Sequence, residues 1–285
     1  MKTRLVTFAD GSYGLRAAGR RLVKQADATG WFSSPSEHWT LHTLRAKLPN
    51  FYSKNEDFIN SHQKGLGLWV WKPAILSYLI ESLDEGEVLL FLDSGCQINA
   101  THESNNRFKE YIGMTSVNDM LVMQLADQSF GFQDLSDSAW TKSSVLASLD
   151  PNSEFRRTNQ IQSGIIFAIK SEKSLRIANQ WLNLCTESNY ANLVNPSEDE
   201  KQSPEYIQHR WEQSILSLVM KSEGISAILD ETYYYPDWQT GLDFPIWAMR
   251  NRSGGDAFRR NALDVVKLSL ARSERKLLEF YRNWT

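Results

Sequence analysis

The sequence predicts an α/β fold, in which a mostly parallel central sheet is flanked by helices and followed by a C-terminal helical extension. Residues 88–92 are apolar at every position, as expected of a central strand that is covered on both faces. Residues 5–9 form a second apolar run, and a helical pattern follows at once; this order is half of a βαβ unit and favours parallel pairing. A third buried strand is expected over residues 164–169, before a helix whose expected N-cap is Ser171.

The expectations for the rest of the chain come from weaker local patterns. Pro73 suits the first turn of a helix that continues to residue 83, because the missing N–H of proline costs nothing there. Few elements are evident in the polar segment 100–160. We further expect a short strand and exit loop at 31–35, helical pieces over 41–64, a strand at 120–125, a surface loop over 187–204, a helix over 205–222 and a short strand over 225–229.

The composition narrows the class of protein. The chain has 285 residues, of which 41% are hydrophobic, so it can bury a large core. A net charge of -3 gives no basic field of the kind that nucleic acid attracts, so nucleic acid is not an expected partner. Cys96 and Cys185 form no metal-like cluster and are expected to be reduced thiols. With no signal-like start and no apolar run of about 18 residues, the expected location is the cytoplasm.

Asp93 is the first candidate for chemistry. It follows the apolar run 88–92 directly, and in open α/β sheets ligands bind beyond the carboxyl ends of such strands. There a carboxylate can hold a ribose hydroxyl or a divalent cation; an ordinary turn or helix-capping role is the alternative. A haloacid-dehalogenase-like phosphatase also uses a strand-end Asp. That pattern needs another Asp two residues later, where this chain has Gly95, and a Thr or Val where it has Gln97.

Four sequence blocks carry a resemblance to a known family. They are Gly-Leu-Trp-Val-Trp-Lys-Pro at 67–73, Leu-Asp-Ser-Gly-Cys-Gln-Ile-Asn at 92–99, Gln-Ile-Gln-Ser-Gly-Ile-Ile-Phe at 160–167 and His-Arg-Trp-Glu-Gln-Ser-Ile at 209–215. Together they resemble a group of bacterial and viral glycosyltransferases of the GT-A type, over roughly residues 60–250. The resemblance implies a GT-A-like (Rossmann-like) catalytic domain over 1–253, with a nucleotide-binding half at 1–99, an acceptor and catalytic half at 100–253, and a helical extension at 254–285.

The resemblance makes Asp93 the first acid of the Asp-x-Asp element that holds the nucleotide-sugar and its metal, with Ser94 beside it. The second acid, usually the direct metal ligand, is Gly95 here. Whether the protein depends on Mn²⁺ or Mg²⁺ is therefore left open by the sequence. If a metal is bound, Asp93 is the ligand that the resemblance suggests. Asn99 or a distant side chain would complete such a site, or basic residues would replace the metal.

Three basic residues are candidates for the donor phosphates. Lys72 lies at a helix start near the same sheet edge, and Arg250 and Arg252 occur together in an aromatic segment. The alternative for each is an exposed surface charge. Asp10 and Ser12 follow the first strand, where the resemblance implies a site for the nucleoside base; a plain strand-to-helix turn explains them as well.

Glu212 and Gln213 resemble the Asp-Gln pair of retaining GT-A enzymes, which sits beside the anomeric carbon of the donor sugar. This implies that Glu212 contacts that sugar or stabilises oxocarbenium charge, whereas in an inverting enzyme it would be a general base. Without the resemblance, Glu212 would be expected to face solvent. Gln162, Ser163 and Gly164 precede a buried strand and are candidates for the pocket floor, although Gly164 is equally explained by close packing.

The sequence therefore predicts a hexosyl-type glycosyltransferase that uses a UDP- or GDP-sugar donor and a glycan or lipid-linked glycan acceptor, in surface polysaccharide synthesis and with retention preferred. A non-catalytic nucleotide- or carbohydrate-binding protein of the same fold is the alternative. The extension after residue 254 carries more basic than acidic side chains. These basic side chains indicate either a solvated helix face or a peripheral contact with the inner face of the membrane.

Overall fold

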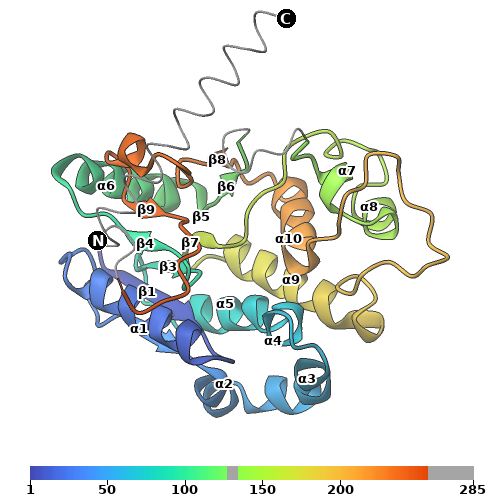
Figure 1. Ribbon diagram of the computed structural model, residues 1–285, viewed down its shortest axis with the longest axis horizontal. Helices are drawn as coiled ribbons and strands as arrows, with labels where there is room; N and C mark the ends of the chain where they lie inside the picture. Colours follow the sequence, from blue (N-terminus) through green and yellow to red (C-terminus); the bar gives the residue numbers. More distant parts are fainter. Residues whose placement is uncertain (127–133, 256–285) are drawn as a thin grey trace, which may run out of the picture.

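The structure is a computed structural model that describes residues 1–126 and 134–255 (Figure 1). The predicted basic helix begins at residue 256 and lies outside the described residues, and so does the suggested membrane contact. Within the described part of the chain, no helix combines the length and the apolar character needed to cross a bilayer. The domain boundary at 253/254 stays a prediction.

The centre of the protein is a five-stranded sheet in the order β2-β1-β3-β7-β5. Its strands are β1 (Thr3–Phe8), β2 (Glu37–Trp39), β3 (Val88–Leu92), β5 (Met120–Leu121) and β7 (Ile165–Ile169). β1 pairs in parallel with β2 and β3, whereas β7 runs antiparallel to both of its neighbours. The predicted mostly parallel sheet is confirmed, and β7 is its reversed strand.

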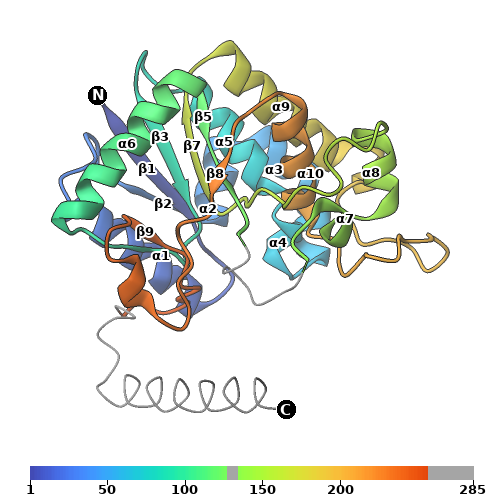
Figure 2. The same ribbon diagram turned by 90° about the horizontal axis from the view of Figure 1, so that it is seen from above.

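Helices cover both faces of this sheet, which makes a three-layer α/β arrangement (Figure 2). The helices are α1 (Tyr13–Asp27), α2 (Leu41–Lys47), α3 (Pro49–Ser61), α4 (Gly65–Leu68), α5 (Trp71–Glu81), α6 (His102–Asn118), α7 (Asp137–Trp140), α8 (Ser143–Leu149), α9 (Glu172–Tyr190), α10 (Trp211–Ser222) and the 3₁₀ helix η2 (Trp238–Gly241). Two small sheets pair β4 (Gln97–Ile98) with β9 (Ile246–Trp247), and β6 (Met123–Gln124) with β8 (Ile228–Leu229).

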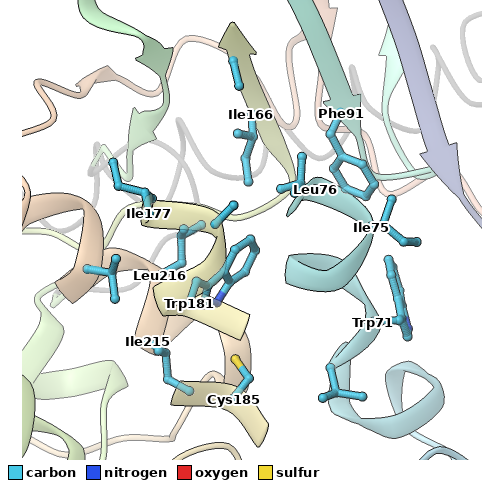
Figure 3. Packing of buried hydrophobic residues seen from close by; sticks show 14 of the residues in the cluster. Trp71, Ile75, Leu76, Phe91, Ile166, Ile177, Trp181, Cys185, Ile215 and Leu216 are labelled. Atoms are coloured by element: carbon cyan, nitrogen blue, oxygen red, sulfur yellow. The ribbon is translucent and has the colours of Figure 1, made fainter. Parts of the chain in front are cut away.

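The two faces of the sheet bury two separate apolar clusters, because successive strand residues point to opposite sides. On β3, Leu89 and Phe91 belong to the larger cluster, which contains the apolar residues of α5, α9 and α10. Leu90 and Leu92 belong to the smaller cluster, with α1 and α6. Figure 3 shows Trp181 of α9 packed between α10 and α5 in the larger cluster.

Local capping signals place several helices as predicted. The Ser171 hydroxyl accepts a hydrogen bond from Ser174 N at 3.0 Å, so Ser171 is the N-cap of α9. Pro73 lies in the first turn of α5. The predicted helical pieces over 41–64 are α2 and α3, and α10 begins at Trp211 rather than at residue 205. The strands expected at 120–125 and 225–229 are shorter, as β5, β6 and β8.

The prediction of a strand at residues 31–35 is wrong. The strand beside β1 is β2, which begins at Glu37 and pairs Trp39 with Phe8. Residues 31–35 instead cover the start of β1, where Ser33 N donates to Thr3 O at 2.9 Å. Trp31 stacks on Phe108 of α6 with ring centroids 4.4 Å apart, so its hydrophobicity serves helix packing and not strand pairing.

The segment 100–160 holds a long helix that the sequence did not reveal. α6 spans 17 residues and buries Ser104, Phe108, Tyr111 and Thr115. These positions follow the spacing of one helix face, but three of the four carry hydroxyl groups. The Thr115 hydroxyl is satisfied by donating to Tyr111 O at 2.7 Å, and that of Ser104 by donating to Asn99 O at 2.7 Å. The apolar periodicity was therefore too weak to identify the helix.

Candidate functional site

The reversal of β7 brings the candidate residues to one edge of the sheet. β3 ends at Leu92, which pairs with Ile165 at the beginning of β7. Residues that precede β7 therefore lie beside residues that follow β3. Asp93 N donates to Gly164 O at 2.8 Å, which extends the ladder by one bond. Ser163 and Gly164 thus lie at the carboxyl end of β3, where ligands of open α/β sheets bind.

A buried ammonium joins two carboxylates at this edge. Lys72 Nζ lies 3.1 Å from Asp93 Oδ1 and 3.1 Å from Glu212 Oε1. We call Lys72, Asp93 and Glu212 the charge triad. The Ser163 hydroxyl donates to Glu212 Oε1 at 2.8 Å and accepts from Lys72 Nζ at 3.2 Å. Residues of α5 and α10 therefore meet the residues that follow β3 and precede β7 in one hydrogen-bonded cluster.

The members of the charge triad differ in their exposure to solvent. The exposed fraction of the side chain is 1% for Lys72, 5% for Glu212 and 44% for Asp93. The interpretation of Lys72 as a surface charge, and of Glu212 as a solvent-facing carboxylate, is therefore wrong. Asp93 is the member of the triad that a ligand can reach most easily.

The buried charges perturb one another. Burial lowers the pKa of Lys72, but Asp93 and Glu212 raise it by more, so its pKa lies above the ordinary value of 10.5. Burial raises the pKa of Glu212 above 4.5 even though Lys72 and Ser163 favour its charged form. Perturbed groups of this kind concentrate at functional sites, although structural ion pairs show them too.

Hydrogen bonds from neighbouring elements fix Glu212 and Ser163. Trp181 Nε1 of α9 donates to the backbone oxygen of Glu212 at 2.8 Å. Gln213 Oε1 accepts from Ser163 N at 3.3 Å, and Gln213 Nε2 donates to Gln160 Oε1 at 2.6 Å. Gln213 therefore positions the segment that precedes β7, and its predicted place near the anomeric carbon stays a prediction.

Gly164 and Gln162, two residues predicted to form the pocket floor, have different surroundings: Gly164 lies against Asp93, whereas Gln162 bonds to Asp230. A Cβ added to Gly164 would lie 3.0 Å from Asp93 Oδ2, so Gly164 allows the carboxylate to pack closely on the backbone. Gln162 Nε2 donates to Asp230 Oδ1 at 3.2 Å, and Asp230 Oδ1 also accepts from Thr232 N at 3.0 Å. Gln162, the residue before Ser163, is therefore hydrogen-bonded to the segment that follows β8.

Gly95, which stands at the position of the missing second acid, is covered by the backbone of Arg250. A Cβ added to Gly95 would lie 3.1 Å from Arg250 Cα, and Asn251 N donates to Gly95 O at 2.9 Å. A larger residue at position 95 would displace this segment. Ser94 is buried, and its backbone oxygen accepts from Arg21 at 2.9 Å. The turn after Asp93 is thus closed by basic residues and backbone amides.

These residues do not form the carboxylate set that a divalent cation prefers. Asp93 is half-exposed but already paired with Lys72. The Asn99 amide donates to Leu242 O and Phe244 O at 2.7 and 2.9 Å, so this group holds a loop. Among the residues that the structure describes, no group of three or more His, Cys, Asp or Glu side chains is arranged around a metal position.

Asp10 and Ser12 organise the turn between β1 and α1. Asp10 Oδ1 accepts from Gly11 N and from Arg16, both at 2.8 Å, and its Oδ2 accepts from Leu41 N at 3.0 Å. Burial raises the pKa of Asp10, but these hydrogen bonds lower it below its ordinary value of 3.8. The Ser12 hydroxyl caps α1 by accepting from Leu15 N. The turn interpretation is therefore correct, and a nucleoside contact stays a prediction.

The exposed arginines Arg250 and Arg252 lie between this turn and the Asp93 turn. A Cβ added to Gly14 of α1 would lie 2.9 Å from Arg252 O, while Arg250 packs on Gly95. Arg250 has a left-handed backbone with φ 54°. The segment after β9 thus crosses from the Asp93 turn to the N-terminal part of α1.

Two arginines escaped the sequence reasoning. Arg21 of α1 is buried and donates to the backbone oxygens of Ser94 and Cys96 at 2.9 and 2.6 Å. Arg210, directly before α10, lies over the Trp140 ring at 3.8 Å. Burial, together with the nearby charge of Arg250, lowers the pKa of Arg210 to about 10. No local pattern distinguishes such arginines from surface ones, because their acceptors come from distant segments.

No family model matches the chain, and no curated protein matches it. Among solved structures, a glycosyltransferase involved in glycosylation of the major capsid of PBCV-1 is 11% identical with a TM-score of 0.44, over 87% of this chain and 92% of that one. Mouse xyloside xylosyltransferase 1 is 8% identical with a TM-score of 0.46, over 92% and 100%. The bifunctional glycosyltransferase WbbM is 11% identical with a TM-score of 0.43, over 85% and 43%.

These three similar structures are glycosyltransferases. Identities and TM-scores this low do not establish a shared activity. What the chain does has to follow from its own residues at the edge of the sheet.

Proposed function

We propose that this protein is a glycosyltransferase that moves a sugar from a nucleotide-sugar donor to a hydroxyl of a glycan acceptor. The observation that carries the proposal is the position of the Lys72 ammonium, 3.1 Å from both Asp93 and Glu212 at the carboxyl end of a buried strand. A fixed pair of carboxylates, one reachable and one buried, suits a reaction in which positive charge develops on a sugar carbon.

The two carboxylates have different roles in this proposal. Asp93, with 44% of its side chain exposed, contacts the donor. Glu212 is held by Ser163 and Lys72 and lies deeper, where it stabilises the developing oxocarbenium charge. Retention of the anomeric configuration is preferred; in an inverting reaction Glu212 would instead accept the proton of the acceptor hydroxyl. Lys72 positions both carboxylates, and its direct contact with a donor phosphate stays a prediction.

The donor diphosphate is assigned to basic side chains in place of a metal ion. Arg250 and Arg252 are exposed and lie beside the Asp93 turn. A guanidinium group can donate two parallel hydrogen bonds to phosphate oxygens, which suits the diphosphate of a UDP- or GDP-sugar. The nucleoside would lie near Asp10 and Ser12, at the adjacent turn. In this arrangement neither Mn²⁺ nor Mg²⁺ is required for donor binding.

The proposed biological setting is based on the resemblance of the four sequence blocks to bacterial and viral glycosyltransferases of the GT-A type. We propose transfer of a hexosyl group to a glycan or lipid-linked glycan during synthesis of a surface polysaccharide, in the cytoplasm or at the inner face of the membrane. The experiments below test the donor and the site first, because they do not require the acceptor.

A non-catalytic nucleotide- or carbohydrate-binding protein is the second candidate. The specific observation in its favour is that the Glu212 carboxylate is already satisfied by Lys72 and Ser163, while Gly95 removes one acid from the site. Such a protein would bind a nucleotide-sugar without hydrolysing it or transferring its sugar.

The first experiment measures thermal stability with UDP, GDP and their hexose conjugates, with Mn²⁺ and with a chelator. A ligand at about 100 times its Kd stabilises the native state by about 2.7 kcal/mol. Hydrolysis of each stabilising sugar nucleotide is then followed. We expect hydrolysis to fall at least about 100-fold in Asp93→Ala and in Glu212→Gln, since each removes a fixed charge from the reacting centre.

The matched control is Glu223→Gln. Glu223 caps the other end of α10 and pairs with Arg176 at 2.8 Å, so this change removes a carboxylate without touching the triad. Full hydrolysis by Asp93→Ala would eliminate the proposed site. Binding without any hydrolysis or transfer in the unmodified protein would favour the second candidate.

A further inference from the structure

A cavity lined by aromatic rings lies outside the charge triad. Its volume is about 360 Å³, and its lining residues are Tyr233, Tyr234, Tyr235, Pro236, Asp237 and Thr240. This volume falls within the range of about 300–1,000 Å³ that small-molecule sites occupy. None of these residues has a part in the donor site proposed above.

One wall of the cavity is rigid. The Tyr234 hydroxyl donates to Glu231 O at 2.9 Å, and its ring stacks on Phe244 with centroids 5.6 Å apart. Gly241 is required beside this ring, because a Cβ at that position would come within 2.2 Å of it. Glu231 is itself held on α6, where its Oε1 accepts from the Tyr111 hydroxyl at 2.8 Å.

The other rings are more open. Tyr235 is 60% exposed. The ring of Tyr233 meets that of Trp238 edge-on with centroids 5.6 Å apart, and lies 6.5 Å from the ring of Tyr235. Asp237 also lines the cavity, and its Oδ1 accepts from Gln239 N at 3.2 Å.

The cavity belongs to a segment that is tied to the donor site at both ends. Where the segment begins, Asp230 Oδ1 accepts from Gln162, the residue before Ser163, at 3.2 Å. Where it ends, Asn251 N donates to Gly95 O at 2.9 Å, two residues after Asp93. Between these ends β9 pairs with β4, which follows the Asp93 turn. The segment that carries the cavity is therefore hydrogen-bonded at both ends to residues next to the charge triad.

The chemistry of the cavity matches a sugar ring. A pyranose has apolar C–H faces, which pack on aromatic rings, and hydroxyl groups, which need a polar partner such as a carboxylate. The exposed ring of Tyr235 supplies the aromatic surface, and Asp237 supplies the carboxylate. We propose that this cavity binds one sugar unit of the acceptor glycan; the acceptor role rests on the proposed function, whereas the binding itself does not.

Saturation-transfer NMR tests the binding without any donor. The probes are the methyl α- and β-pyranosides of glucose, galactose and mannose, each at millimolar concentration. We expect transfer from the protein to the C–H protons of at least one glycoside. Tyr235→Ala should weaken that binding about tenfold, because it removes the exposed stacking surface, and Asp237→Asn should weaken it less. Leu242→Ala, an exposed residue of the same segment outside the cavity lining, should leave binding unchanged.

The outcomes separate this inference from the proposed function. Glycoside binding that Tyr235→Ala abolishes supports the cavity even where no sugar nucleotide is hydrolysed. No transfer to any of the six glycosides, or transfer that is equal in Tyr235→Ala and Leu242→Ala, would overturn it. Transfer to the base protons of added UDP that disappears in Tyr235→Ala would also overturn it, because the cavity would then hold the nucleoside.

Discussion

The edge of the sheet that carries the candidate site has two unlike regions. The charge triad lies among α5, α9 and α10, and Lys72 and Glu212 have almost no contact with solvent. The segment from Thr232 to Arg252 lies on the other side of Asp93, and its Tyr235 and Arg250 are exposed. Asp93 stands between the two regions and is half-exposed.

This difference separates positioning from recognition. Charges in the interior interact strongly and are stable only when every partner is present, so the triad needs a closely packed support. Exposed rings and guanidinium groups gain little from one another in water and are available to a ligand. Changes in the triad should therefore affect folding and chemistry together, whereas changes in the exposed segment should affect binding alone.

The largest expected effect is that of Lys72→Met. It leaves the buried Glu212 carboxylate without its cation, and breaking a buried pair in this way costs about 3–5 kcal/mol of unfolding free energy. Urea unfolding measures this cost. Lys170→Met is the control, because Lys170 is exposed and its ammonium donates to a backbone oxygen, Glu81 O, at 2.6 Å.

The double variant Lys72→Met/Glu212→Gln completes this test. Since it removes the orphaned charge as well, we expect it to recover a large part of the lost unfolding free energy. A single Lys72→Met variant as stable as the unmodified protein would show that the pair does not carry the folding of this region.

The next effect concerns the exposed region. Arg250→Gln should weaken binding of UDP or GDP, whichever stabilises the protein, by about 10- to 100-fold, because one charged hydrogen bond to phosphate contributes about 1.5–3 kcal/mol. Unfolding free energy should be nearly unchanged. Calorimetric titration measures the Kd, and Arg20→Gln, an exposed arginine of α1, is the control. Equal loss of uridine or guanosine binding would contradict a phosphate contact.

A pH titration gives a smaller effect with a defined sign. Burial raises the pKa of Glu212 in the folded state above its ordinary value of 4.5, so the folded state keeps this proton after the unfolded state has lost it. The stability that Glu212 contributes is therefore full below pH 4.5 and is lost as pH rises through the folded pKa. The unfolding free energy of the unmodified protein minus that of Glu212→Gln should fall as pH rises from 4.5 through the folded-state pKa of Glu212. A rise would contradict the assignment.

The elements that could be predicted are those whose signals are local. The run 88–92 becomes β3 and delivers Asp93, because five adjacent apolar residues suffice to mark a central strand. Ser171 caps α9, because the N–H group that donates to its hydroxyl, that of Ser174, lies only three residues away. The sequence thus predicted β3 and the position of Asp93 directly after it.

The arrangement of the site could not be predicted, because it depends on contacts between distant segments. The direction of β7 decides that Ser163 lies beside Asp93, and no residue in β7 marks that direction. For Lys72 the sequence left open a phosphate contact or a surface charge, because the two acids that pair with its buried ammonium are distant in sequence. Arg21 was missed for the same reason, as its acceptors follow β3.

The smallest effect separates support of the triad from ordinary core packing. Trp181→Phe removes the hydrogen bond to Glu212 O at 2.8 Å and should cost about 1–2 kcal/mol of unfolding free energy. Trp39→Phe is the matched control, because Trp39 is 1% exposed and its Nε1 donates to Glu37 Oε2 at 3.0 Å, on β2. The two variants should lose similar stability. Only Trp181→Phe should slow hydrolysis of the sugar nucleotide, by several-fold, because only that indole fixes the backbone that carries Glu212. Equal rates in the two variants would mean that α9 supports the fold of α10 without setting the position of its carboxylate.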